Sequence, residues 1–251
     1  MTAESCSVSA TVPAERSVAI QNLRTSLSRF QQARHFAARS DNVVSTGISA
    51  LDDILPNRGL TRGTLSEWIA ANPGGGTLSL AMRAAGQAQC KGPLVIVDRQ
   101  KHFYAPAFGA VGVCPEKTIL VRPESRADEL WAVEQSLRCS GIGAVICQID
   151  HLKTQQFRRL QLAAESGTAI GLLIRPAAAQ RQSGWADIRL LVSPHPSLQH
   201  SFRRRLEVQC VYIRGGLASQ TVKLDVCDEK NTVRLVSGVS HSASALRTAG
   251  T

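Results

Sequence analysis

The chain has 251 residues, of which 43% are hydrophobic and 19% charged, and its formal net charge is +10. This composition is typical of a folded globular protein and excludes a disordered chain, and no apolar run reaches the roughly 18 residues needed to cross a bilayer. The positive charge favours polyanions such as nucleic acid, with a merely solvated arginine-rich surface as the alternative. The seven cysteines form no C-x-x-C pair, so we expect no metal site.

The first 42 residues precede the main domain. Residues 1–15 lack periodicity and predict a mobile leader. From 15 to 38, apolar residues recur at steps of three and four, which predicts an amphipathic helix. The residues that mark its apolar face are Ile20, Leu23, Leu27 and Phe30. This face packs on the protein's own core or docks on another subunit or partner.

Short β-rich runs alternate with helical patterns from residue 64 onward. The predicted strands are 64–69, 94–98, 118–121, 144–149 and 169–174, and the predicted helices are 77–90, a segment near Ala105, 127–139 and 154–165. Strands and helices that alternate at these lengths predict a parallel sheet with helices on both faces. The runs 94–97 and 169–174 are apolar throughout, which places them at the centre of the sheet.

The pattern changes after Pro176. Residues 177–185 predict a loop, and three further strands follow without helices between them, at 188–192, 205–213 and 221–226. We expect an α/β core domain at 43–228 whose mainly parallel sheet carries an antiparallel C-terminal extension. Residues 229–251 are expected to form a strand and a partly flexible tail.

A glycine-rich turn joins the first of these strands to the first helix. Phosphate-binding loops place G-x-x-x-x-G-K-[ST] there, because backbone N–H groups hold the anion and the lysine reaches the terminal phosphates. The remnant of that pattern here is Asn72, Pro73, Gly74, Gly75, Gly76 and Thr77. Gly76 occupies the lysine position of the motif, and Ala70 occupies the position of its first glycine. The turn can still offer N–H groups to an anion, or serve only as a turn.

Two motifs just upstream carry a family resemblance. Residues 45–52 read S-T-G-I-S-A-L-D, and residues 59–67 read G-L-T-R-G-T-L-S-E. Together they resemble the RecA superfamily pattern that leads into the phosphate loop, over about residues 43–223. The resemblance implies a RecA-like fold of the phosphate-loop NTPase type.

The same resemblance indicates which ATP-hydrolysing residues are missing. Gln100 stands where RecA has the glutamate that activates water, and Gln148 stands at the metal-binding aspartate. A glutamine cannot accept a proton, and loss of a general base costs about 10²- to 10⁴-fold in rate. Asp150 is displaced from the aspartate position by two residues, about 6.5 Å along a strand. We therefore expect a non-enzyme with no cofactor, with weak ATP binding left open.

Among RecA relatives, the chain is most similar to the ImuA family. The matching stretches are Leu173–Pro176, Asp187–Leu190 and Val211–Gly216. This resemblance implies a bacterial accessory protein of inducible, error-prone translesion DNA synthesis. Its implied partners are a translesion polymerase or an inactive polymerase-like subunit, RecA, and single-stranded DNA. The implied location is the cytoplasm, with association with the nucleoid left open.

Basic residues late in the chain are candidate contacts for nucleic acid or a partner. They are Arg181, Arg203, Arg204, Arg205 and Arg214. Phosphate contacts usually come from such side chains, although a solvated turn explains the triplet equally well. Two other functions stay open at this point. One is a divergent ATPase in which Asp150 holds metal and Lys101 or Lys153 supplies the cation, and the other is a nucleic-acid-binding or cell-division regulator.

Overall fold

The structure, a computed structural model, describes residues 42–195, 203–216, 218, 220–227 and 232–236. From Val43 onward these residues belong to one compact unit. The predicted leader and the helix bearing Ile20, Leu23, Leu27 and Phe30 lie outside the described residues, as does the tail after 236. In the part that the structure describes, no helix combines the length and the apolar character needed to span a bilayer.

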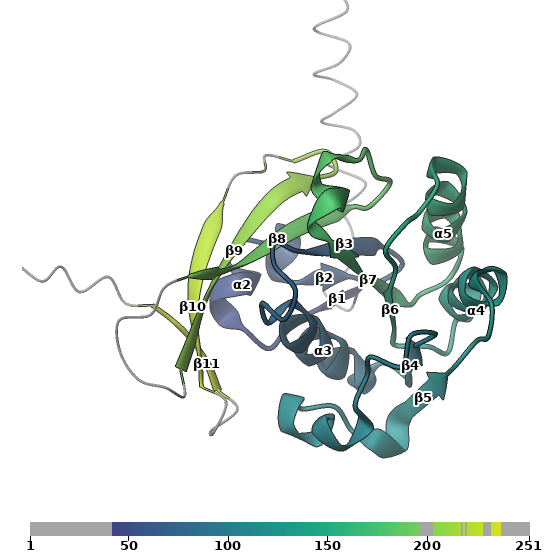
Figure 1. Ribbon diagram of the computed structural model, residues 1–251, viewed down its shortest axis with the longest axis horizontal. Helices are drawn as coiled ribbons and strands as arrows, with labels where there is room; N and C mark the ends of the chain where they lie inside the picture. The colour runs from purple at the N-terminus through teal and green to yellow at the C-terminus, as the bar shows by residue number, and fades with distance from the viewer. Residues whose placement is uncertain (1–41, 196–202, 217, 219, 228–231, 237–251) are drawn as a thin grey trace, which may run out of the picture. The chain divides into compact units, whose positions relative to one another are not determined.

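A large mixed sheet organises the fold (Figure 1). Within the described residues it has nine strands in the order β11-β10-β9-β8-β3-β7-β6-β4-β5. Their bounds are β3 (Leu65–Ala70), β4 (Leu94–Val97), β5 (Thr118–Val121), β6 (Ala144–Gln148), β7 (Ile170–Pro176), β8 (Ile188–His195), β9 (Arg203–Ile213), β10 (Thr221–Cys227) and β11 (Thr232–Leu235). The six strands from β8 to β5 run parallel, and β9, β10 and β11 extend the sheet in antiparallel fashion.

Helices cover both faces of the parallel part. Helix α3 (Thr77–Gln87) packs in one hydrophobic cluster, while α4 (Arg126–Arg138) and α5 (Thr154–Ser166) pack in another. Strand β4 shows the division, because Ile96 lies in the first cluster and its neighbour Val97 in the second. The predicted α/β architecture with an antiparallel extension is therefore confirmed.

Three details differ from the prediction. Residues 188–192, expected in the antiparallel part, form the start of β8, which pairs parallel with β3. The run 94–97 is fully buried because helices cover both of its faces, yet β4 lies beside the edge strand β5. The helix expected near Ala105 is two short 3-10 turns, Ala105–Ala107 and Gly109–Val111, and Gly112 ends the segment with a left-handed φ of 81°.

The motif at 45–52 is a closed hydrogen-bonded turn. The carboxylate of Asp52 accepts hydrogen bonds from the Ser45 hydroxyl at 2.5 Å, the Thr46 hydroxyl at 2.8 Å and the Thr46 amide at 2.9 Å. Thr46 is completely buried. The turn leads into α2 (Ser49–Asp52). The spacing of Ser45, Thr46 and Asp52 in the motif thus allows the hydrogen bonds that stabilise this turn. A two-stranded ribbon of β1 (Val43–Val44) and β2 (Leu60–Thr61) flanks it.

A buried ion network ties the three central strands together. The Glu67 carboxylate on β3 lies 3.0 Å from Nη1 of Arg175 on β7 and 2.6 Å from Nε of Arg189 on β8. The side chains of Glu67 and Arg175 are 2% and 1% exposed. Burial lowers the pKa of the Arg175 guanidinium, although arginine stays protonated. The network fixes β3 between its two parallel neighbours.

Neutralising this carboxylate is expected to destabilise the protein strongly. Glu67→Gln leaves two guanidinium groups without their counter-charge, and breaking a buried pair costs about 3 to 5 kcal/mol. The control is Asp225→Asn, which breaks the more exposed pair with Arg205 (2.8 Å) and is expected to lower the free energy of unfolding far less. Equilibrium urea unfolding measures both. Equal losses in the two variants would contradict the role of the network.

Candidate functional site

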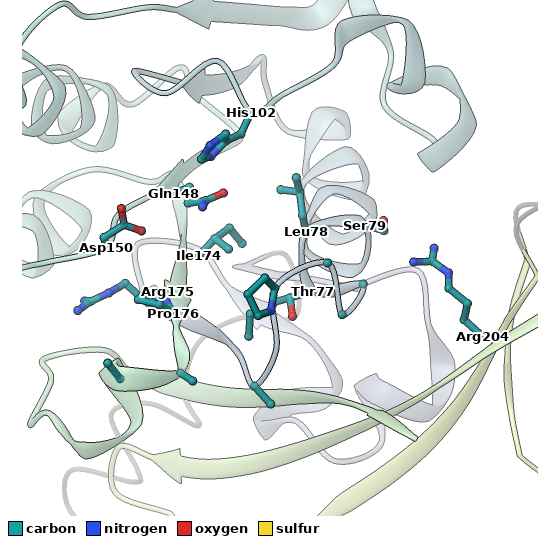
Figure 2. A pocket seen from close by; sticks show the side chains of 18 residues that line it. Thr77, Leu78, Ser79, His102, Gln148, Asp150, Ile174, Arg175, Pro176 and Arg204 are labelled. Carbon is teal, nitrogen blue, oxygen red and sulfur yellow. The ribbon is translucent and has the colours of Figure 1, made fainter. Parts of the chain in front are cut away.

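A pocket of about 740 Å³ opens at the carboxyl ends of β3, β6 and β7 (Figure 2). In open parallel sheets this end of the strands is where ligands bind. The residues that line the pocket are Ala70, Ala71, Pro73, Gly74, Gly75, Gly76, Thr77, Leu78, Ser79, His102, Gln148, Asp150, Ile174, Arg175, Pro176, Ala177, Ala178 and Arg204. The predicted phosphate-loop remnant therefore lies in its wall.

The conformation of the loop depends on its glycines. Gly74 and Gly76 have φ values of 72° and 83°, in the left-handed region that side chains rarely adopt. Gly76 is also the N-cap of α3, and no side chain caps that helix. A Cβ atom at Gly76 would lie 2.8 Å from Cδ1 of Leu206 on β9, whereas one at Gly74 would meet nothing within 4 Å. A side chain at the lysine position would therefore require Leu206 to shift.

The Thr77 hydroxyl is an unpaired polar group in this wall. Thr77 is 3% exposed, and its Oγ1 has no hydrogen-bond partner in the structure. An unsatisfied buried hydroxyl costs about 1 to 3 kcal/mol. Its position in the pocket lining therefore points to a polar ligand that would satisfy it.

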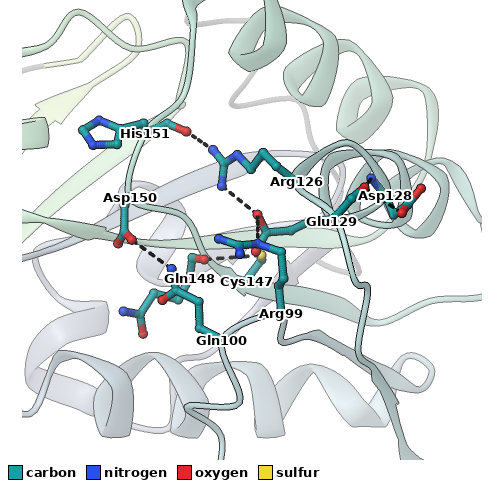
Figure 3. Close-up of polar contacts among 10 residues, drawn as sticks. Arg99, Gln100, Arg126, Asp128, Glu129, Cys147, Gln148, Asp150 and His151 are labelled. Carbon is teal, nitrogen blue, oxygen red and sulfur yellow. Dashed lines mark hydrogen bonds and ion pairs between the residues drawn. The ribbon is translucent and has the colours of Figure 1, made fainter.

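The residues at the other two expected catalytic positions, Gln100 and Gln148, lie near Asp150. Nε2 of Gln100 donates to Oδ2 of Asp150 at 3.0 Å (Figure 3). Gln148 ends β6 and lines the pocket together with Asp150. The amides of Gln100 and Gln148 carry no charge, and the Asp150 carboxylate is engaged by one of them. Within the described residues, no three His, Cys, Asp or Glu side chains cluster as a metal site requires.

A second ion cluster involves residues that are adjacent in the sequence to Gln100 and Asp150. Glu129 of α4 is 1% exposed and pairs with Arg126 at 2.7 Å and Arg99 at 3.4 Å (Figure 3). Arg126 also donates to the backbone carbonyl of His151. Burial, followed by the charge of Glu129, raises the pKa of the neighbouring Cys147 thiol, which stays protonated. This cluster joins α4 to the segments that carry Gln100 and Asp150, and no sequence pattern indicated it.

The structure separates the basic candidates. Arg204 and Arg205 belong to β9, which begins at Arg203, two residues before the predicted strand 205–213, and neighbouring strand residues point to opposite faces. Arg204 lines the pocket, whereas Arg205 pairs with Asp225. The side chain of Arg203 lies outside the described part.

Two other basic candidates are also apart from the pocket. Arg181 is exposed at the end of the 3-10 turn Ala177–Arg181 and does not line it. Arg214 pairs with Glu165 and Asp187, each at 3.2 Å, which gives it a structural role.

Comparison with known proteins finds a partial similarity to RecA. No protein-family model matches the chain. RecA of Chlorobaculum tepidum is 30% identical over 105 residues, and RecA of Chlorobium chlorochromatii is 30% identical over 104 residues. Each match covers 41% of this chain, and this chain spans only 30% and 29% of the two RecA proteins. The similarity supports a RecA-like relationship and agrees with the α/β fold.

Alanine substitutions at the two left-handed glycines test the packing against Leu206. Gly74→Ala is expected to cost about 1 to 2 kcal/mol from backbone strain alone. Gly76→Ala adds the overlap with Leu206, about 1 to 3 kcal/mol more. In a Leu206→Ala background, Gly76→Ala is expected to cost no more than Gly74→Ala does. Denaturant unfolding measures all of these, and equal costs of the two alanines in the wild-type background would show that Leu206 does not close this space.

Proposed function

We propose that this chain is a non-catalytic RecA-like accessory or scaffold protein in DNA damage tolerance. Its task is error-prone translesion synthesis in an SOS-type response, as in the ImuA family that its motifs resemble. The similarity to RecA over 105 residues supports a role connected with DNA repair. The protein acts through contacts with other proteins, and single-stranded DNA is a further candidate partner.

The observation that carries the proposal is the state of the phosphate loop. ATP-hydrolysing loops place a lysine on the terminal phosphates, where its charge stabilises the transition state. Here the position is Gly76, which has left-handed backbone, and a Cβ atom there would lie 2.8 Å from Cδ1 of Leu206. The loop lacks the charge, and a side chain at this position would require Leu206 to shift.

The glutamines at the other two positions support the same conclusion. Gln100 can orient a water molecule but cannot take its proton, and Gln148 offers an amide where a carboxylate would hold magnesium. Asp150 accepts a hydrogen bond from Gln100 and is the one carboxylate among the described residues that line the pocket. The residues at all three positions, Gly76, Gln100 and Gln148, therefore disfavour ATP hydrolysis.

A divergent ATPase is the less favoured alternative. It requires a lysine from elsewhere in the chain, and Lys101 and Lys153 are the candidates from the sequence. Both are exposed, and neither lines the pocket. A contribution from the same chain would need a rearrangement of the segments that carry them.

Exposed aromatic side chains support a role through protein contacts. Trp131 on α4 is 63% exposed and lines a shallow hollow between α4 and α5 with Arg159. Tryptophan and arginine are enriched among the residues that dominate binding energy at protein interfaces.

The purified chain is expected to show no ATP turnover. With magnesium and single-stranded DNA, its steady-state rate should equal that of Thr77→Ala, because neither protein has the lysine or the general base. RecA assayed in parallel serves as the positive control. Turnover that Gly74→Asp or Thr77→Ala removes would contradict the non-catalytic proposal.

Affinity isolation from damage-treated cells tests the partnership. The tagged chain is expected to retain a translesion polymerase or a polymerase-like subunit, identified by mass spectrometry. Trp131→Ala is expected to reduce the recovery, while Leu162→Ala, which removes another exposed apolar side chain (44% exposed), leaves it unchanged. Recovery of cell-division proteins in place of a polymerase would contradict the proposal.

A further inference from the structure

Helices α4 and α5 lie side by side (Figure 1), and a shallow hollow of about 180 Å³ lies between them. Ala127, Leu130 and Trp131 line the hollow from α4. Their spacing of three and four residues places the three side chains on one face of the helix. Leu160 lines the hollow from α5. Both helices therefore contribute to an apolar part of this surface.

Trp131 gives the hollow the character of a binding surface. It is the largest apolar side chain of α4 and is 63% exposed. A tryptophan that becomes covered buries roughly 150 to 250 Å². A cavity of roughly 150 Å³ holds a benzene ring, so the volume beside Trp131 suits one aromatic or branched aliphatic side chain.

One end of the hollow is positively charged. The buried carboxylate of Glu134 lies 2.8 Å from Nη2 of Arg138 and 2.5 Å from Nη2 of Arg159. The two arginine side chains are 53% and 66% exposed. One buried anion thus positions two exposed cations, which leaves one positive charge in excess. Each guanidinium group has further N–H groups with which it can bind a carboxylate.

We propose that the hollow between α4 and α5 binds an acidic amphipathic helix of a partner protein. This inference rests on the proposed function, because it names the kind of partner segment through which the chain acts. An apolar side chain of that helix fills the hollow beside Trp131. Carboxylates on the same face of the partner helix accept hydrogen bonds from Arg138 and Arg159.

The layout of the hollow fits a helix. Arg138 follows Trp131 by seven residues, which is about 10 Å along α4, or two helical turns. A partner helix presents side chains at the same spacing on one face, so one helix reaches both the apolar and the charged part. An amphipathic helix that lies in a hydrophobic groove is a recurring mode of peptide recognition.

The charges favour a different protein over a second copy of this chain. Two copies of the same face would bring Arg138 and Arg159 against their own counterparts, and like charges repel. The amphipathic helix predicted at residues 15–38 is also basic, with four arginines between residues 16 and 34. An occupant that supplies carboxylates to this surface is therefore a different protein.

A nucleic-acid strand matches the hollow poorly. Proteins hold single strands in grooves that combine a series of cations with several stacking aromatic rings. The described residues that line this hollow include one aromatic ring, that of Trp131, and one arginine, Arg159. The buried carboxylate of Glu134 also lines it and would repel phosphate.

Fluorescence anisotropy with the full chain and labelled peptides tests the proposal. The probe is a short helix-forming peptide with leucine and phenylalanine on one face and glutamate elsewhere. One control peptide has alanine in place of the apolar residues, and the other has lysine in place of every glutamate. The alanine peptide measures the general attraction of a basic protein for an acidic peptide. The probe is expected to bind roughly tenfold more tightly than either control, because it alone has both the apolar anchor and the carboxylates.

Substitutions in the hollow are expected to weaken binding of the acidic probe. Trp131→Ala should cost roughly tenfold in affinity, since tryptophan dominates the binding energy of many interfaces. Arg159→Glu should abolish binding of the probe and increase the affinity for the lysine peptide. The matched controls are Leu162→Ala and Arg181→Glu, which alter exposed side chains outside the hollow and should change the affinity by no more than about twofold. Circular dichroism verifies that each variant is folded.

Several results would overturn the proposal. The wild type would bind the probe no better than the alanine peptide, or Trp131→Ala or Arg159→Glu would bind it as well as the wild type does. A wild-type dimer that Trp131→Ala separates in analytical ultracentrifugation would assign the hollow to a second copy. A single-stranded oligonucleotide that loses affinity in Trp131→Ala, while the peptide does not, would assign it to nucleic acid.

These outcomes differ from those that test the proposed function. Failure of the acidic probe to bind leaves the non-catalytic accessory function intact, with the partner bound at another surface. ATP turnover, or recovery of cell-division proteins from cells, would refute that function while binding of the acidic helix in the hollow stood.

Discussion

The packing of Leu206 against Gly76 is the contact on which the candidate site depends. It joins the antiparallel extension to the phosphate loop, which the parallel part of the sheet supplies. The loop lacks the lysine, and a side chain at its position would approach Leu206 closely. The same contact fixes the face of β9, which brings Arg204 to the pocket. Strand β9 thus contributes both Leu206 and Arg204 to the surroundings of the loop.

The Glu67 network holds the other side of this arrangement in place. Strand β3 leads directly into the loop, and its carboxylate pairs with arginines on both neighbouring strands. Buried ion pairs add little net stability, but an unpaired member is costly, so such a network favours one register of β7, β3 and β8. The residues at the carboxyl ends of these strands, which form the pocket, follow from that register.

Much of the fold follows from local patterns in the sequence, because helices and strands have different periods. Strand pairing is harder to predict from the sequence. Strand β8 pairs with β3 from more than a hundred residues away, and no local pattern distinguishes a parallel from an antiparallel partner. The loop and its glycines were predicted as a site, but the role of Leu206 was not, since it depends on tertiary packing. The arginine triplet was predicted to lie at the start of the strand 205–213, with a solvated turn as the alternative. The alternating burial of Leu206, Val208 and Cys210 agrees with a strand, which places Arg204 and Arg205 on opposite faces.

Phosphorus NMR of ATP in the presence of excess protein, magnesium and single-stranded DNA tests the central claim most directly. The account predicts that the ATP resonances persist for hours with no inorganic phosphate released. Appearance of ADP and phosphate at a rate that depends on the protein would contradict it.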